Sequence, residues 1–169
     1  MALAQLSGVT NDEIKAGMAS FQGIERRFDF KIKTDKIVYL SDYAHHPEEI
    51  KQSILSLRAL YQDKKIPAIF QPHLYTRTRD FYLDFADSLS LLDEVILTDI
   101  YPARELPIEG ASSQLVYDHL SPNIEKTLCK KEEVLDVLMN KNIEVLITLG
   151  AGDIENYASQ ICEILNKRC

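Results

Sequence analysis

Polar and apolar residues alternate in two neighbouring stretches of this chain, residues 27–33 and 37–42. A period of two residues is typical of a β-strand with one buried face. Thr34 and Asp35 lie between the two stretches and suit a short turn. The pattern therefore predicts a β-hairpin, with its first strand at the edge of a sheet.

Beyond residue 46 the period changes, and amphipathic stretches of helical period alternate with short apolar runs that are typical of buried strands. The predicted helices cover residues 47–61, 77–90, 112–120, 131–140 and 153–167. The predicted strands cover residues 66–70, 94–99, 124–128 and 143–149. This order predicts an α/β fold: a Rossmann-like, mostly parallel sheet of about six strands, with one antiparallel edge strand and helices on both faces.

Two further segments lie outside this repeat. A short peripheral helix is predicted at residues 11–20, because Thr10 and Glu13 have the spacing of a capping box. Residues 101–110 form the longest predicted connection and leave the end of a strand. Loops in such places carry functional residues, so this one is expected to border a site.

The composition narrows the classes of protein. A chain of 169 residues with 46% hydrophobic residues can bury a full core and fits one globular domain. Its formal net charge of -7 argues against a nucleic-acid binder, and no apolar run approaches the roughly 20 residues that span a bilayer. The three cysteines, Cys129, Cys162 and Cys169, form no CxxC pair, and no signal peptide is recognisable, which favours the cytoplasm.

Polar side chains gather at the ends of two predicted strands, residues 37–42 and 66–70. Open α/β sheets bind ligands in the crevice outside the carboxyl ends of their strands. The two groups therefore predict one shared site. They consist of Asp42, Tyr43, His45 and His46 in the first group, and of His73, Arg77 and Arg79 in the second.

These side chains permit two kinds of chemistry. Arg77, near the start of a predicted helix, can bind a carboxylate through two hydrogen bonds. An anionic small ligand is therefore compatible with the negative net charge of the chain. Histidines beside a carboxylate either hold a charged substrate or bind a metal ion. No metal-ligand spacing such as HExxH occurs, so no metal is predicted. A metal-dependent hydrolase that uses Asp42, His45, His46 and His73 stays open as an alternative.

The turn after the last predicted strand is a further candidate for the border of the site. Gly150, Gly152 and Asp153 lie between an apolar strand and a helix, so backbone N–H groups there could meet an anion. Two glycines are equally typical of a plain tight turn, and the dinucleotide fingerprint requires a third. The chain contains neither a GxxxxGK[ST] phosphate loop nor a GxSxG nucleophile elbow.

Four ordered motifs resemble the C-terminal domain of the Mur ligase family, in the form found in members that join L-alanine to UDP-N-acetylmuramate. The resemblance runs from about Phe21 to the C-terminus, and residues 21–28 resemble the family's junction between the central and C-terminal domains. The motifs are Asp42-Tyr43-Ala44-His45-His46-Pro47, Phe70-Gln71-Pro72-His73-Leu74-Tyr75-Thr76-Arg77-Thr78-Arg79-Asp80, Asp99-Ile100-Tyr101-Pro102-Ala103-Arg104-Glu105 and Leu149-Gly150-Ala151-Gly152-Asp153-Ile154.

The resemblance implies one part of a three-domain ligase of peptidoglycan precursor synthesis. Residues 21–169 would be the C-terminal domain, residues 1–20 a remnant of the central ATP-binding domain that contains its last helix, and Met1 an artificial start. The whole ligase would use ATP and Mg²⁺, bound mainly by the absent central domain, to phosphorylate the muramoyl carboxylate. The amine of L-alanine would then attack the acyl phosphate, while domain closure excludes water. The fragment alone would be inactive.

The motifs also imply residue roles. Asp42 would contact the ribose of ATP, and Arg77 would take a carboxylate. The residues around L-alanine and the adjoining muramoyl group would be Tyr43, His45, His73 and Arg77, with His45 and His73 as the catalytic residues. The residues at the border of the site would be His46, Arg79, Gly150, Gly152 and Asp153.

One departure from the family pattern concerns Leu74, where many members have arginine. One of two anion contacts is therefore missing, and either Arg79 or another arginine compensates, or Arg77 and the histidines bind the carboxylate alone. The murein tripeptide ligase shares this domain plan and is the nearer alternative. The QPH…YTR form that begins at Gln71 favours the alanine-joining members over it.

Overall fold

A six-stranded sheet forms the centre of the molecule in the computed structural model, which describes residues 2–21 and 23–168. The strand order is β1-β2-β6-β3-β4-β5, and only the pair β1–β2 is antiparallel. The predicted α/β sheet with one antiparallel edge strand is thus confirmed. The strands are β1 (Asp29–Lys33), β2 (Val38–Asp42), β3 (Pro67–Phe70), β4 (Glu94–Leu97), β5 (Glu125–Leu128) and β6 (Val145–Leu149).

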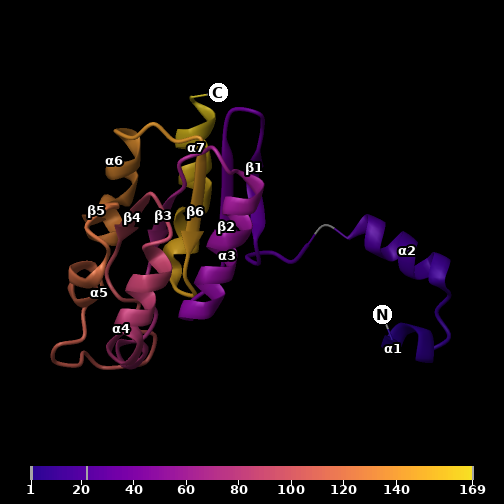
Figure 1. Cartoon of the computed structure of the whole chain (residues 1–169), viewed down its shortest axis with the longest axis horizontal. Coiled ribbons are helices and arrows are strands. Elements are labelled where there is room, and N and C mark those ends of the chain that lie inside the picture. The colour runs from indigo at the N-terminus through magenta and orange to yellow at the C-terminus, as the bar shows by residue number, and fades with distance from the viewer. Residues whose placement is uncertain (1, 22, 169) are drawn as a thin grey trace.

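Helices cover both faces of this sheet, as predicted (Figure 1). One buried cluster joins α3, α4 and α5 to the sheet, and a second joins α6 and α7 to its other face. The first group comprises α3 (Pro47–Leu60), α4 (Tyr75–Leu89) and α5 (Ser113–His119). The second comprises α6 (Val134–Met139) and α7 (Ala158–Asn166), which follow the 3-10 turns Lys131–Glu133 and Asp153–Tyr157. The predicted helices at 131–140 and 153–167 therefore each begin with a 3-10 turn.

Two helices precede the sheet and lie apart from it in Figure 1. The helix α2 (Asn11–Ser20) is the predicted one, and Thr10 and Glu13 form its capping box. The resemblance implied one helix over residues 2–20, whereas the structure has a separate helix α1 (Ala2–Leu6) before α2. Neither helix contains a buried residue, and Leu3 and Leu6 are 80% and 87% exposed. This segment contributes nothing to the core of the domain.

The register of the sheet sets the position of the candidate site. The central strand β6 pairs with β2 on one side and with β3 on the other, and Leu149 is opposite both Asp42 and Phe70. The chain leaves β2 and β3 towards helices on one face, whereas it leaves β6 towards α7 on the other face. Connections that diverge in this way leave a crevice at the carboxyl ends of the strands.

Three residues that the sequence analysis named lie outside the described residues. They are Met1, Gln22 in the junction segment, and Cys169. Cys129 and Cys162 are free thiols. Among the described helices, none is both long and apolar enough to cross a bilayer.

Candidate functional site

The turn from β2 to α3 is fixed by hydrogen bonds that its own sequence supplies. Pro47 is the first residue of α3, a position where its missing N–H and fixed φ favour helix initiation. The Glu49 carboxylate accepts hydrogen bonds from the backbone N–H groups of His45 (3.1 Å) and His46 (3.3 Å). The His45 side chain is fixed as well, because its Nδ1 lies 2.9 Å from the carbonyl oxygen of Tyr43. Since a carbonyl can only accept, Nδ1 donates here, and in the neutral ring the free lone pair lies on Nε2.

The turn from β3 to α4 is held by unusual backbone geometry at Leu74. This residue precedes α4 with φ 74° and ψ 135°, in the region of positive φ that non-glycine residues seldom adopt. Its backbone N–H donates to the carbonyl oxygen of Tyr101 (2.9 Å), and its own carbonyl accepts from the Thr78 backbone N–H (3.1 Å) and hydroxyl (2.8 Å). These contacts bring His73 and Arg77 to the same side of the turn.

The side chains of the two turns lie next to one another. The ring of Tyr43 lies edge-on to that of His45 with centroids 5.3 Å apart, and His45 lies 5.8 Å from His73. The Arg77 Nη1 lies 3.2 Å from the His73 Nδ1. All four side chains are half-buried, so they remain accessible to a ligand. We call these four residues the rim cluster.

The environment of His73 favours the neutral imidazole. Burial lowers the pKa of His73 below its usual 6.5, and the positive charge of Arg77 and the neighbouring His45 lower it further. Because Arg77 can only donate, the Nδ1 of His73 accepts, and the proton of the neutral ring lies on Nε2.

We expect an NMR titration of the chain to place the midpoint of His73 below pH 6.5. The Arg77→Ala variant should raise this midpoint only in part, because burial is the larger cause. Since the unfolded chain then binds more protons than the folded one, the free energy of unfolding should fall as the pH is lowered through 6.5. Arg79→Ala, which removes an exposed guanidinium outside the rim cluster, should leave the midpoint unchanged. A midpoint at or above 6.5 in the parent chain would contradict this account.

Three other predicted site residues point elsewhere. The oxygens of buried Asp42 accept hydrogen bonds from the Ser53 hydroxyl (2.6 Å) and the Ala44 backbone N–H (3.1 Å). His46 is exposed and packs its ring on Phe81, with centroids 5.1 Å apart. The guanidinium of Arg79 pairs with the adjacent Asp80 at 2.7 Å. None of these three side chains joins the rim cluster.

This placement weakens the alternative of a metal-dependent hydrolase. A metal site requires three or four convergent ligands. Of the four proposed ligands, His45 and His73 approach each other, whereas Asp42 is bound within the turn and His46 faces Phe81. Across residues 2–21 and 23–168, no group of three histidine, cysteine, aspartate or glutamate side chains has the geometry to hold a metal ion.

The turn of residues 150–153 packs tightly against Gln71 and Tyr101. Gly150 has φ 143°, and a Cβ placed on it would lie 2.8 Å from the backbone oxygen of Gln71. A Cβ on Gly152 would lie 2.7 Å from the Cβ of Tyr101. Asp153 accepts hydrogen bonds from Lys131 (2.5 Å) and from the side-chain amide of Gln71 (2.8 Å). The glycines are therefore required for close packing of the strand ends.

Two further residues contact the rim cluster, and the sequence indicated that they flank or border the site but not which side chains they contact. Tyr101 stacks on His73 with ring centroids 5.6 Å apart and an interplanar angle of 22°. Arg26 lies over the ring of Tyr43, with its Cζ 4.6 Å from the centroid. The loop after β4 was expected to border the site, and in the structure its Glu105 accepts hydrogen bonds from the Thr76 backbone N–H (3.0 Å) and hydroxyl (2.5 Å).

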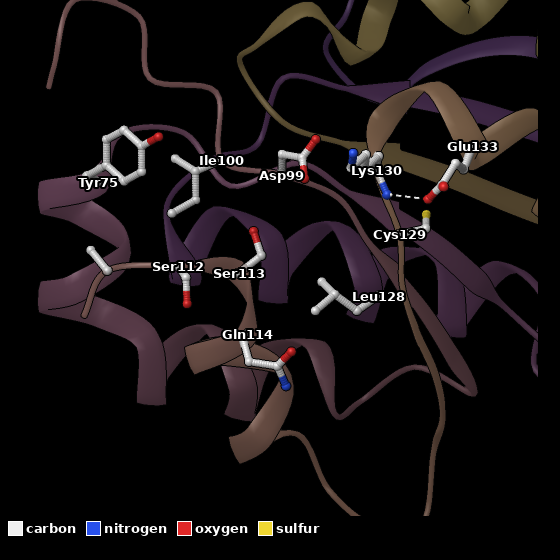
Figure 2. Close-up of a pocket in the computed structure, with 11 residues that line it drawn as sticks. Tyr75, Asp99, Ile100, Ser112, Ser113, Gln114, Leu128, Cys129, Lys130 and Glu133 are labelled. Carbon is white, nitrogen blue, oxygen red and sulfur yellow. Dashed lines mark hydrogen bonds between the residues drawn. The ribbon is translucent and has the colours of Figure 1, made fainter. Parts of the chain in front are cut away.

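A hollow of about 470 Å³ lies beside the rim cluster, at the carboxyl ends of β4 and β5. Figure 2 shows Tyr75 at one end of it and Asp99, Lys130 and Glu133 towards the other. The backbone N–H of Lys130 donates to Glu133 (2.8 Å). None of the four rim residues lines this hollow, so it is separate from them.

Comparison with known proteins gives a consistent family and fold. The family described as "Mur ligase, glutamate ligase domain" matches residues 26–156. The chain is 77% identical to a UDP-N-acetylmuramate–L-alanine ligase of Phocaeicola vulgatus over 168 residues, which is 99% of this chain but 37% of that relative.

Solved structures match the same family and fold. A UDP-N-acetylmuramate-alanine ligase of Thermotoga maritima matches with a TM-score of 0.80 and 26% identity over 99% of this chain and 36% of that one. The fold also matches a MurF ligase of Thermotoga maritima in complex with ADP, with a TM-score of 0.64 and 18% identity over 99% of this chain and 37% of that one.

Proposed function

Because this chain belongs to the Mur ligase family, by its match to the glutamate ligase domain, we propose that it is the C-terminal, amino-acid-binding domain of a ligase that joins L-alanine to UDP-N-acetylmuramate in the cytoplasm. The observation that carries the proposal is the convergence of Tyr43, His45, His73 and Arg77 on one rim. The 77% identity to an alanine ligase supports alanine over the murein tripeptide.

The rim cluster suits an amino acid as substrate. The guanidinium of Arg77 would bind a carboxylate through two parallel hydrogen bonds. His45 has its Nδ1 proton engaged by a carbonyl, so its Nε2 can accept a proton from the ammonium group of alanine. Neutral His73, with its proton on Nε2, would donate a hydrogen bond to the adjoining muramoyl group. Positioning of the amine against an activated carboxyl is then the main contribution of this domain.

ATP would supply the phosphoryl group that activates the muramoyl carboxylate. Asp42 lines a hollow of about 320 Å³ together with Arg27 and Phe28. A carboxylate suits the hydroxyls of a ribose, and a guanidinium suits a phosphate, so these residues fit the nucleotide. In the whole ligase the Mg²⁺ ion that accompanies ATP would be bound mainly by the central domain, as the family resemblance implies.

We also propose the domain division implied by the family. Residues 21–169 form the C-terminal domain, and residues 1–20 belong to the central domain. The absence of buried residues in α1 and α2, with Leu3 and Leu6 exposed in α1 and Met18 exposed in α2, supports this division. In the whole ligase these apolar side chains would pack against the central domain.

The proposal is tested by assaying ADP release and amide formation with ATP, UDP-N-acetylmuramate and L-alanine. The present chain should be inactive, and a ligase that carries it together with N-terminal and central domains should be active. Turnover with the tripeptide in place of L-alanine would favour the murein tripeptide ligase. Robust turnover by the present chain alone would overturn the assignment.

A further inference from the structure

The segment that leads into the sheet, residues 24–28, is anchored through the backbone of Arg26. Arg26 has φ 61° and Phe28 has φ 49°, a conformation that non-glycine residues adopt rarely. The Arg26 N–H donates to the Asp29 carboxylate (3.1 Å), and its carbonyl accepts from the Tyr43 N–H (2.7 Å). Arg26 is therefore held in an unfavourable conformation by contacts on both sides.

The side chain of Arg26 joins two strand ends. Its Cζ lies 4.6 Å from the centroid of the Tyr43 ring, which follows β2. Its Nη2 donates to the carbonyl oxygen of Gly152 (3.3 Å), in the turn after β6. Its Nε is buried without a hydrogen-bond partner and lies 3.9 Å from the Glu155 carboxylate. Glu155 is itself held by Ser41 and by Lys31 (3.2 Å).

We propose that Arg26 is a positioning residue, which fixes the Tyr43 ring within the rim cluster and ties it to the segment that leads into the domain. Arg26 does not belong to the rim cluster itself. The ring of Tyr43 contacts the ring of His45, which in turn contacts His73, so the orientation of Tyr43 affects the whole cluster. This inference rests on the proposed function, since it assigns Arg26 a role at the amino-acid site.

A purely structural role is the competing explanation, and the chain offers a matched control. Lys33 lies over the ring of Phe30, with Nζ 4.6 Å from the centroid. This pair is also a cation over an aromatic ring in the hairpin region, but it makes no contact with Tyr43. Loss of the Lys33 pair should lower stability without altering the site, whereas loss of the Arg26 pair should alter the site as well.

The first experiment uses a ligase that carries this domain. Arg26→Ala should lower kcat/KM for L-alanine by about 2- to 30-fold, mostly through KM, which corresponds to the strength of a cation–π contact. Arg26→Lys should recover part of the loss, since it restores the charge over the ring but not the planar fork. Lys33→Ala should leave kcat/KM unchanged. Equal losses in Arg26→Ala and Lys33→Ala would overturn the proposal.

A double-mutant cycle then links Arg26 to Tyr43. In a Tyr43→Ala background, Arg26→Ala should cause no further loss of kcat/KM, because the ring that it positions is absent. Additive losses would overturn the proposal. If Arg26→Ala does not fold, Arg26→Lys takes its place in the cycle.

The second experiment uses the present chain and does not depend on ligase activity. NMR signals of the Tyr43 ring should shift in Arg26→Ala and remain in place in Lys33→Ala. An unchanged Tyr43 ring in Arg26→Ala would overturn the positioning role. An inactive parent ligase would instead overturn the proposed function, so the two failures are distinguishable.

Discussion

Replacing Arg77 by alanine in a ligase that carries this domain should lower kcat/KM for L-alanine by about 10- to 150-fold. This range follows from the roughly 1.5–3 kcal/mol of a hydrogen bond to a charged group. Most of the change should appear in KM for alanine or for the muramoyl substrate, because Arg77 binds rather than reacts. The kcat/KM of Arg77→Lys should lie between that of the parent ligase and that of Arg77→Ala, since lysine keeps the charge without the planar fork.

Arg79→Ala provides the comparison for this experiment. Arg79 lies two residues further along α4, is exposed, and pairs with Asp80. Its removal should change kcat/KM by less than about twofold, in line with the small contribution of an exposed ion pair. An equal loss in both variants would contradict the assignment of the carboxylate to Arg77. It would favour Arg79 as the substitute for the arginine that Leu74 replaces.

The Gly150→Ala change should destabilise the domain by about 2–4 kcal/mol. An added Cβ would lie 2.8 Å from the backbone oxygen of Gln71, and the residue would keep φ 143°, so steric overlap and backbone strain add together. For a chain of 169 residues this corresponds to a fall in Tm of roughly 5–15 °C. Thermal unfolding followed by circular dichroism measures it.

Gly17→Ala is the matched control for this prediction. Gly17 lies within α2, and nothing comes within 4 Å of a Cβ placed there. Alanine has a higher helix propensity than glycine, so the change should be neutral or slightly stabilising. A similar loss of Tm in both variants would show that the packing of the strand ends does not explain the effect.

Most of the sheet could be predicted because its strands are short apolar runs with clear periods. The hairpin at residues 27–42 and every later strand were placed to within a few residues. The helix boundaries were less accurate for local reasons. The helix α4 begins at Tyr75 and not at residue 77, because Leu74 adopts positive φ and accepts hydrogen bonds from Thr78. A single sequence gives no sign of that conformation at a leucine.

The convergence of the site could be predicted, but the direction of each side chain could not. The adjacent side chains of His45 and His46 point in different directions: the His45 ring contacts His73, and the His46 ring contacts Phe81. In β2, Ser41 and Asp42 alternate between the two faces, so Asp42 meets Ser53 in α3. The contact of Arg26 with Tyr43 depends on the positive φ of Arg26, which the sequence does not reveal.

The place of β6 in the sheet has a consequence for how the protein is made. This strand comes last in the sequence, yet it lies between β2 and β3 and contacts both. During synthesis on the ribosome, β2 and β3 emerge first and leave unpaired edges that are open to aggregation. The two halves of the rim cluster therefore come together only when the C-terminal residues have been translated, because β6 is the strand that joins β2 to β3.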